Sequence, residues 1–96
     1  MYARVTKYRM KPEAMNDSIA LLQELKPQIM ALPGMIHFIN VANEDGNGYV
    51  IALVESKEIS DANKDRVAQI WARFGDLLAA PPEPVGYDVL MSEAKA

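Results

Sequence analysis

The feature that most limits the fold of this sequence is an unbroken apolar run over residues 49–54, Tyr-Val-Ile-Ala-Leu-Val. Short apolar runs that follow a turn signal and are rich in β-branched residues are typical of β-strands. Because alternate side chains of a strand point to opposite faces of its sheet, this run predicts a strand that is apolar on both faces. The sheet that contains it therefore needs cover on both sides.

A β-hairpin is predicted around this run. Residues 43–48, Asn-Glu-Asp-Gly-Asn-Gly, are a concentrated turn signal between two apolar segments, as expected where antiparallel strands are joined. The two strands are predicted over residues 35–42 and 48–55. On one side the first of them carries Met35, His37, Ile39 and Val41, and on the other side Ile36, Phe38, Asn40 and Ala42.

The N-terminal part of the chain predicts a strand and a helix. Residues 2–9 have a strand pattern, and Lys11-Pro12-Glu13 is a helix start, with proline tolerated and glutamate favoured in the first turn. Apolar residues then recur at helical spacing as far as Ile29. Pro27 interrupts this stripe, so we expect a kink or a break near residues 23–27.

The C-terminal part predicts a second helix and a last strand. Ser60-Asp61 resembles an N-cap with an acidic first turn, and the helix is predicted to reach about Ala79. The prolines of residues 81–84 end it, and the last strand is predicted over residues 85–91. The order β-α-β-β-α-β thus predicts one α+β domain over residues 1–96, since a chain of this length supports one hydrophobic core.

Two helices cover one face of such a sheet and leave the other open. An open apolar sheet face would exceed the few hundred Å² that soluble monomers usually expose. A second copy of the chain is the economical cover, so the sequence predicts a homodimer. The alternative is that these side chains are scattered at the sheet edges, where exposed apolar atoms are common.

Composition narrows the classes of partner and cofactor. The net charge of -3 arises from interspersed charges, which disfavours nucleic acid as a partner because phosphate binding needs clustered Lys and Arg. No apolar run reaches membrane-spanning length and no signal peptide is visible, so we expect no membrane and a cytoplasmic location. The chain has no cysteine and one histidine, and it has no glycine-rich phosphate motif. We therefore expect neither a metal nor another cofactor.

The strand order, a first helix ending in Leu32-Pro33-Gly34, and the segment over residues 77–90, Leu-Leu-Ala-Ala-Pro-Pro-Glu-Pro-Val-Gly-Tyr-Asp-Val-Leu, resemble the antibiotic biosynthesis monooxygenase-like domains. The resemblance implies the dimeric α/β-barrel superfamily, in which ferredoxin-like protomers pack their four-stranded antiparallel sheets together. The family includes cofactor-independent quinol or polyketide oxygenases and haem-degrading enzymes. The haem-degrading branch has an Asn on the first strand and a Trp and a His on the second helix. Here only Trp71 matches, which disfavours haem degradation.

Two residues are candidates for proton transfer. His37 is the only histidine, and imidazole is the side chain best suited to moving protons near neutral pH; the alternative is a structural or interface histidine. Asp88 lies among apolar residues of the last strand and is the second candidate base. It is also placed to pair with Arg4, Arg9 or a residue of a partner chain.

Four further residues are predicted to form the walls of a ligand pocket, namely Trp71, Phe74, Tyr87 and Asn40. Aromatic rings on a helix face suit a flat ligand between helix and sheet, although packing in the core explains them equally. Tyr87 alternatively packs at an interface, and Asn40 alternatively bonds to the hairpin turn.

Two functions follow from these residues and the resemblance. One is a small-molecule-binding homodimer that acts as a cofactor-independent monooxygenase on an aromatic or quinol-like substrate, with His37 or Asp88 as the base. The other is a non-enzymatic ligand-binding or interaction domain, which the scarcity of proton-transfer residues favours.

Overall fold

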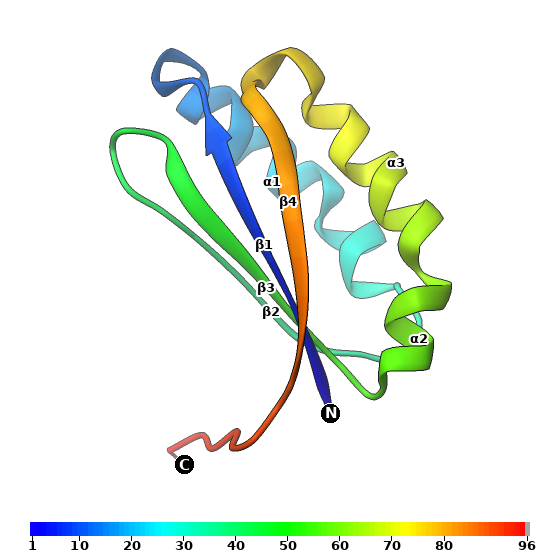
Figure 1. Ribbon diagram of the computed structural model, residues 1–96. Coiled ribbons are helices and arrows are strands. Elements are labelled where there is room, and N and C mark those ends of the chain that lie inside the picture. The colour runs from blue at the N-terminus through cyan, green and yellow to red at the C-terminus, as the bar shows by residue number, and fades with distance from the viewer. Residues whose placement is uncertain (96) are drawn as a thin grey trace.

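The computed structural model describes residues 1–95, in which a four-stranded sheet has its helices on one side (Figure 1). The elements follow the chain as β1 (Tyr2–Met10), η1 (Pro12–Ala14), α1 (Met15–Met30), β2 (Met35–Ala42), β3 (Asn47–Val54), α2 (Lys57–Ala62), α3 (Lys64–Phe74), η2 (Gly75–Leu77) and β4 (Leu78–Asp88). The strand order is β2-β3-β1-β4, and each neighbouring pair is antiparallel. The predicted α+β, ferredoxin-like fold is confirmed.

The hairpin of β2 and β3 forms where the turn signal predicts it. Strand β2 has the predicted bounds, and β3 begins one residue earlier than predicted. The side chain of Asn43 holds the turn by accepting hydrogen bonds from the backbone N–H groups of Asp45 and Asn47, at 3.0 and 3.2 Å. Gly46 has a φ of 88°, a conformation that glycine adopts without steric cost.

The predicted break near Pro27 is wrong, because α1 runs without interruption through it. Proline in a helix leaves the carbonyl four residues earlier without its usual donor. That carbonyl belongs to Gln23, and both residues are exposed, so water can satisfy it. The cost of the proline is therefore lower than it would be in a buried turn.

The second helical region differs from its prediction at both ends. Ser56, rather than Ser60, is the N-cap, and its hydroxyl accepts a hydrogen bond from the backbone N–H of Ile59 at 3.2 Å. The region is divided at Asn63 into α2 and α3, and α3 ends at Phe74 instead of Ala79. Ser60-Asp61 has the pattern of an N-cap followed by an acidic first turn. Ser56 lies one turn earlier, and its hydroxyl caps the helix instead.

Strand β4 is longer than predicted and includes the proline-rich segment. It begins at Leu78 and ends at Asp88, whereas the predicted strand began only after Pro84. The chain tolerates prolines here because β4 is an edge strand, with hydrogen bonds required on one side only. The prolines therefore do not end the helix, which stops at Phe74, and they do not delay the strand.

The hydrophobic core lies between the helices and one face of the sheet. Its buried members come from β1, β3, α1 and α3, and they are Tyr8, Met10, Leu25, Ile29, Val50 and Phe74. A register shift in β2 between Met35 and His37 turns Met35 toward this face, opposite Val54, and leaves His37 on the other face, opposite Leu53. The predicted sharing of one side by Met35 and His37 is therefore wrong, because strict alternation fails at a β-bulge.

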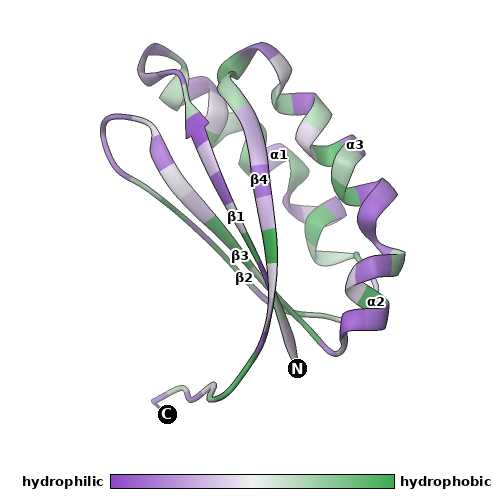
Figure 2. Ribbon diagram, viewed as in Figure 1, coloured by the Kyte–Doolittle hydropathy of each residue, from purple (hydrophilic) through white to green (hydrophobic). Residues whose placement is uncertain are grey.

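The other face of the sheet has no helix over it. Figure 2 shows the part of β3 nearer α2 in green, whereas the start of the strand is purple to white. Five large apolar side chains that register places on this open face are 40–54% exposed, namely Ile39, Val41, Tyr49, Val85 and Tyr87. The sheet is thus apolar on both faces, as predicted. None of the helices within residues 1–95 is long and apolar enough to cross a membrane.

Candidate functional site

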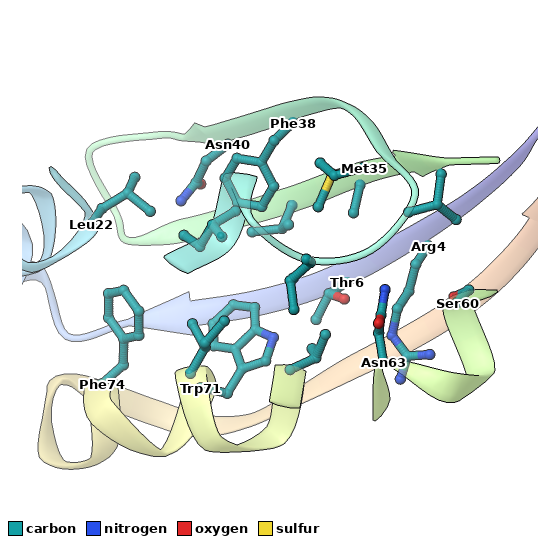
Figure 3. Close-up of a pocket in the computed structure, with 17 residues that line it drawn as sticks. Arg4, Thr6, Leu22, Met35, Phe38, Asn40, Ser60, Asn63, Trp71 and Phe74 are labelled. Carbon is teal, nitrogen blue, oxygen red and sulfur yellow. The ribbon is translucent and has the colours of Figure 1, made fainter. Parts of the chain in front are cut away.

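A cavity of about 70 Å³ lies between the helices and the sheet (Figure 3). We call it the inner cavity. Strands β1, β2 and β3 form its floor, and α1, α2 and α3 form its roof. Its lining is mainly apolar and aromatic, and it includes Leu22, Met35, Phe38, Val50, Val67, Ile70, Trp71 and Phe74, together with the polar residues Arg4, Thr6, Asn40, Ser60 and Asn63.

A wider groove of about 400 Å³ adjoins the inner cavity between α3 and the edge strand β4. Its other lining residues are Lys64, Ala68, Ala72, Gly75, Leu78, Pro82 and Pro84, and it shares Arg4, Thr6, Val67 and Trp71 with the inner cavity. The groove exists because Ala68 and Ala72 of α3, and Gly75 directly after this helix, lie at helical spacing along β4. These residues are too small to fill the space. We call this the α3–β4 groove.

Trp71 stands between the two spaces and belongs to a row of three aromatic rings. Its ring centroid is 5.7 Å from that of Tyr8 and 5.8 Å from that of Phe74, with interplanar angles of 51° and 52°. Tilted pairs at this separation are favourable and hold the rings in place. One wall of the site is therefore a fixed aromatic surface.

Asn40 and Tyr8 form the polar pair at one end of the inner cavity. The Tyr8 hydroxyl donates to Asn40 Oδ1 at 2.5 Å and also approaches the Val41 carbonyl oxygen at 3.3 Å. Burial raises the pKa of Tyr8, and the hydrogen bond with Asn40 opposes this only in part. The phenol is therefore protonated at neutral pH and acts as a donor, and Asn40 is left with its NH2 group to offer to a ligand.

Arg4 lies at the other end, toward Ser60 and Asn63 (Figure 3). Its Nε is buried and has no hydrogen-bond partner among residues 1–95. An unpaired buried donor costs about 1–3 kcal/mol. The neighbouring polar side chains are nearly inaccessible, with Thr6, Ser60 and Asn63 at 2%, 4% and 5% exposure. Asn63 already has a structural role, because its Nδ2 donates to the Pro33 carbonyl oxygen at 2.9 Å.

The structure brings three of the six predicted site residues into the inner cavity. Asn40, Trp71 and Phe74 line it. Tyr87 instead lies on the open face and is 54% exposed, because it pairs with Ala3 on that side of β1. The three are positioned by β2 and α3, which face each other across the core.

Neither predicted catalytic residue lies in the inner cavity or the α3–β4 groove. His37 is exposed on the open face, and Asp88 is the exposed last residue of β4, opposite Tyr2. Among residues 1–95, Asp88 forms no ion pair with Arg4 or Arg9, the pairing considered for it from the sequence. His37 alternates regularly with Ile39 and Val41, which places it on the open face with them, and Asp88 lies at the end of its strand.

Arg4 and Thr6 line both spaces, although neither was predicted as a site residue from the sequence. Strict alternation in residues 2–10 does place both of them on one side of the strand. That side becomes the helix-covered face. In the described part of the chain no cluster of three or more His, Cys, Asp or Glu is placed to hold a metal ion.

Comparison with known proteins identifies the fold. No protein-family sequence model matches this chain, and no curated protein matches it significantly in sequence. A protein of unknown function from Nitrosomonas europaea has a TM-score of 0.81 and 18% identity, over 99% of this chain and 94% of its own. A monooxygenase from the gene ActVA-Orf6 of Streptomyces coelicolor, solved in complex with nanaomycin D, has a TM-score of 0.76 and 19% identity, over 99% and 92%.

A solved antibiotic biosynthesis monooxygenase has a TM-score of 0.76 and 15% identity, over 95% of this chain and 100% of its own. These likenesses cover nearly the whole of each chain. They show that this chain has the fold of the antibiotic biosynthesis monooxygenase-like proteins, as the resemblance in sequence predicted. At these identities the likeness concerns the fold, and the chemistry has to be argued from the site.

Proposed function

We propose that this protein binds a flat aromatic small molecule in the inner cavity and the α3–β4 groove, and that it does so as a homodimer. The observation that carries the proposal is the position of Trp71, whose ring forms a wall of both spaces. Apolar walls with a few convergent polar groups are typical of small-molecule sites. Here those polar groups are Asn40 and Arg4, at opposite ends.

The sizes of the two spaces indicate how a ligand would lie. The inner cavity, at about 70 Å³, is smaller than the roughly 150 Å³ that accommodates benzene in a buried site. The α3–β4 groove, at about 400 Å³, is within the roughly 300–1,000 Å³ of ligand pockets. The ring system of the ligand would therefore lie in the groove against Trp71, and a substituent would enter the inner cavity.

The open face supports the dimer. Its five exposed apolar side chains, Ile39, Val41, Tyr49, Val85 and Tyr87, lie on three strands of one continuous sheet, and the helices all occupy the opposite face. A second copy of the same face is complementary to it by symmetry and removes this apolar area from water. Helices would then lie outside and the two sheets inside.

A second candidate function, a cofactor-independent monooxygenase, is favoured by one observation. The fold is shared over nearly full length with the Streptomyces coelicolor monooxygenase solved with nanaomycin D. On a substrate such as anthrone, the reaction consumes O2 and gives anthraquinone and water. One oxygen atom becomes the new carbonyl, and the other leaves as water with the two hydrogens of the methylene group.

Such a reaction needs a proton acceptor for the substrate. The lining residues of the two spaces include neither an imidazole nor a carboxylate. His37 stays the first candidate for the base and Asp88 the second. His37 lies on the face that the proposed dimer buries, so a catalytic role for it depends on assembly.

Binding is tested by titrating the 15N-labelled full chain with 2-naphthamide and 2-naphthoate. Trp71 is the only tryptophan, so its single indole N–H resonance reports on the site without assignment. We expect this resonance to shift saturably with at least one compound. Ala72→Phe fills the groove and should abolish the shift, whereas Ala20→Phe on the exposed side of α1 should leave it unchanged. A resonance that neither compound moves contradicts the proposal.

Oxygenase activity is tested by following O2 uptake with anthrone and with a hydroquinone. O2 uptake faster than in buffer at the same pH supports the monooxygenase function. Uptake equal to that in buffer contradicts the monooxygenase function and does not affect the proposed binding function. In an active protein His37→Ala should abolish turnover while the indole shift is retained. Unchanged turnover would remove His37 from the mechanism, and Asp88→Asn would then be the variant to measure.

A further inference from the structure

We infer that the ligand of this site is an aromatic anion, and that Arg4 binds its negatively charged group. This inference rests on the proposed binding function and goes beyond it by assigning the charge of the ligand and the residue that recognises it. The expected class is a planar ring system bearing a carboxylate or another oxyanion.

The Arg4 side chain has a buried hydrogen-bond donor for which residues 1–95 supply no acceptor. Its Nε is buried without a hydrogen-bond acceptor, and the ion pairs within residues 1–95 do not include it. It lines both the inner cavity and the α3–β4 groove. A guanidinium presents donors in a planar fork that matches the two oxygens of a carboxylate. An oxyanion placed beside it would satisfy the donor that is otherwise unpaired.

The charges of the site favour an anion over a neutral molecule. The charged residues that line the two spaces are Arg4 and Lys64, both cations. Lys64 lies 3.8 Å from Asp61, and Lys57 shares the same carboxylate at 3.4 Å. One carboxylate thus faces two ammonium groups, so this cluster of three side chains is net positive. The apolar lining lowers the local dielectric and strengthens the attraction of Arg4 for a ligand anion.

The groove selects a flat molecule. Trp71 forms one wall, and the pyrrolidine rings of Pro82 and Pro84 lie on β4 opposite the small residues of α3. Thr6 and Arg4 lie on β1 between these walls, and Thr6 is 2% exposed. A ring system lying along Trp71 would therefore bring an attached oxyanion to Arg4. The hydroxyl group of Thr6 is placed to donate a second hydrogen bond.

The test compares two compounds of the same shape and different charge. The Trp71 indole resonance of the full chain is titrated with 2-naphthoate and with its neutral amide, 2-naphthamide. We expect naphthoate to bind about 10-fold or more tightly, the effect of a charge-assisted hydrogen bond. Equal affinities would overturn the inference and leave the proposed function standing. If neither compound binds, the proposed function fails and the inference fails with it.

Variants then assign the preference to Arg4. Arg4→Met keeps an apolar stem of similar length, and it should remove the preference for naphthoate while naphthamide still binds. Arg4→Lys keeps the charge without the fork and should give an intermediate preference. Arg9→Gln is the matched control, because Arg9 lies on the same strand but is exposed on the open face. A preference that survives Arg4→Met, or is lost in Arg9→Gln, would overturn the assignment.

Discussion

The hydroxyl of Tyr8 on β1 donates to Asn40 on β2, across the whole width of the intervening strand β3. The two residues are 32 positions apart in sequence. The Tyr8 ring passes over Gly48 of β3, and a Cβ atom on this glycine would lie 2.6 Å from both the hydroxyl oxygen and Cζ of Tyr8. Because Gly48 has no side chain, the Tyr8 side chain of β1 can cross β3 and donate its hydrogen bond to Asn40 of β2.

Gly48→Ala should destabilise the protein by about 1–3 kcal/mol, the usual cost of overpacking a well-packed site. The added methyl group meets the Val41 carbonyl oxygen of β2 as well as the Tyr8 ring, so both the backbone of β2 and the ring must shift. Urea unfolding followed by circular dichroism measures the loss. Gly86→Ala is not a neutral control, since it meets the Tyr2 ring. Gly75→Ala meets no atom within 4 Å but has a positive φ, so it reports the backbone cost alone.

Stability should fall as the pH rises above about 10, partly because of Tyr8. Burial raises the pKa of this phenol above its ordinary value of 10.0. The unfolded chain therefore releases the Tyr8 proton at a lower pH than the folded chain, which favours unfolding at alkaline pH. The contribution is fully present below pH 10 and is lost as the pH rises through the folded pKa. Urea unfolding between pH 8 and pH 11 should show a smaller decline in Tyr8→Phe.

Much of the fold was predictable because it depends on local patterns. The turn at residues 43–48 fixed the hairpin, and the apolar run of β3 indicated a sheet that is apolar on both faces. The break predicted at Pro27 does not occur, because the cost of a helical proline depends on whether the freed carbonyl can reach water. Exposure of that kind is a tertiary property. The proline-rich segment likewise belongs to a strand only because β4 lies at the sheet edge.

The candidate site was predictable only in part. Trp71, Phe74 and Asn40 could be proposed because aromatic and amide side chains on core-facing positions suggest a pocket. His37 was proposed for its chemistry. Alternation places it on one side with Ile39 and Val41, but it does not reveal that this side is the face without helices. Arg4 was the opposite case, since from the sequence it was considered only as an ion-pair partner for Asp88. Only the packed structure shows that its Nε is buried and that it lines the two spaces.

Ser56→Ala should cost about 1 kcal/mol of stability, with a range of about 0.5–2 kcal/mol. The Ser56 hydroxyl accepts the hydrogen bond from the Ile59 N–H at the start of α2, and alanine leaves that donor unpaired. Thermal and urea unfolding measure the difference. Ser92→Ala, in the exposed C-terminal segment after β4, is the control and should be neutral. An effect of Ser92→Ala as large as that of Ser56→Ala would show that the cap is not its source.

Ile39→Lys should convert the proposed dimer into a monomer. Ile39 lies on the open face, opposite Ile51 of β3, and is 40% exposed. In a dimer that buries this face, each copy would place an ammonium group in an apolar interface, which is strongly unfavourable without a paired carboxylate. Light scattering coupled to size exclusion measures the mass at micromolar concentration.

The matched control is Ile19→Lys on α1, where the isoleucine is 53% exposed on the helical side of the molecule. Both substitutions remove the same side chain and add the same charge, so they differ only in the face that they alter. We expect the dimer mass for Ile19→Lys and the monomer mass for Ile39→Lys. A monomer mass for the unsubstituted chain would show that the open face stays uncovered, and a dimer mass for Ile39→Lys would place the interface elsewhere.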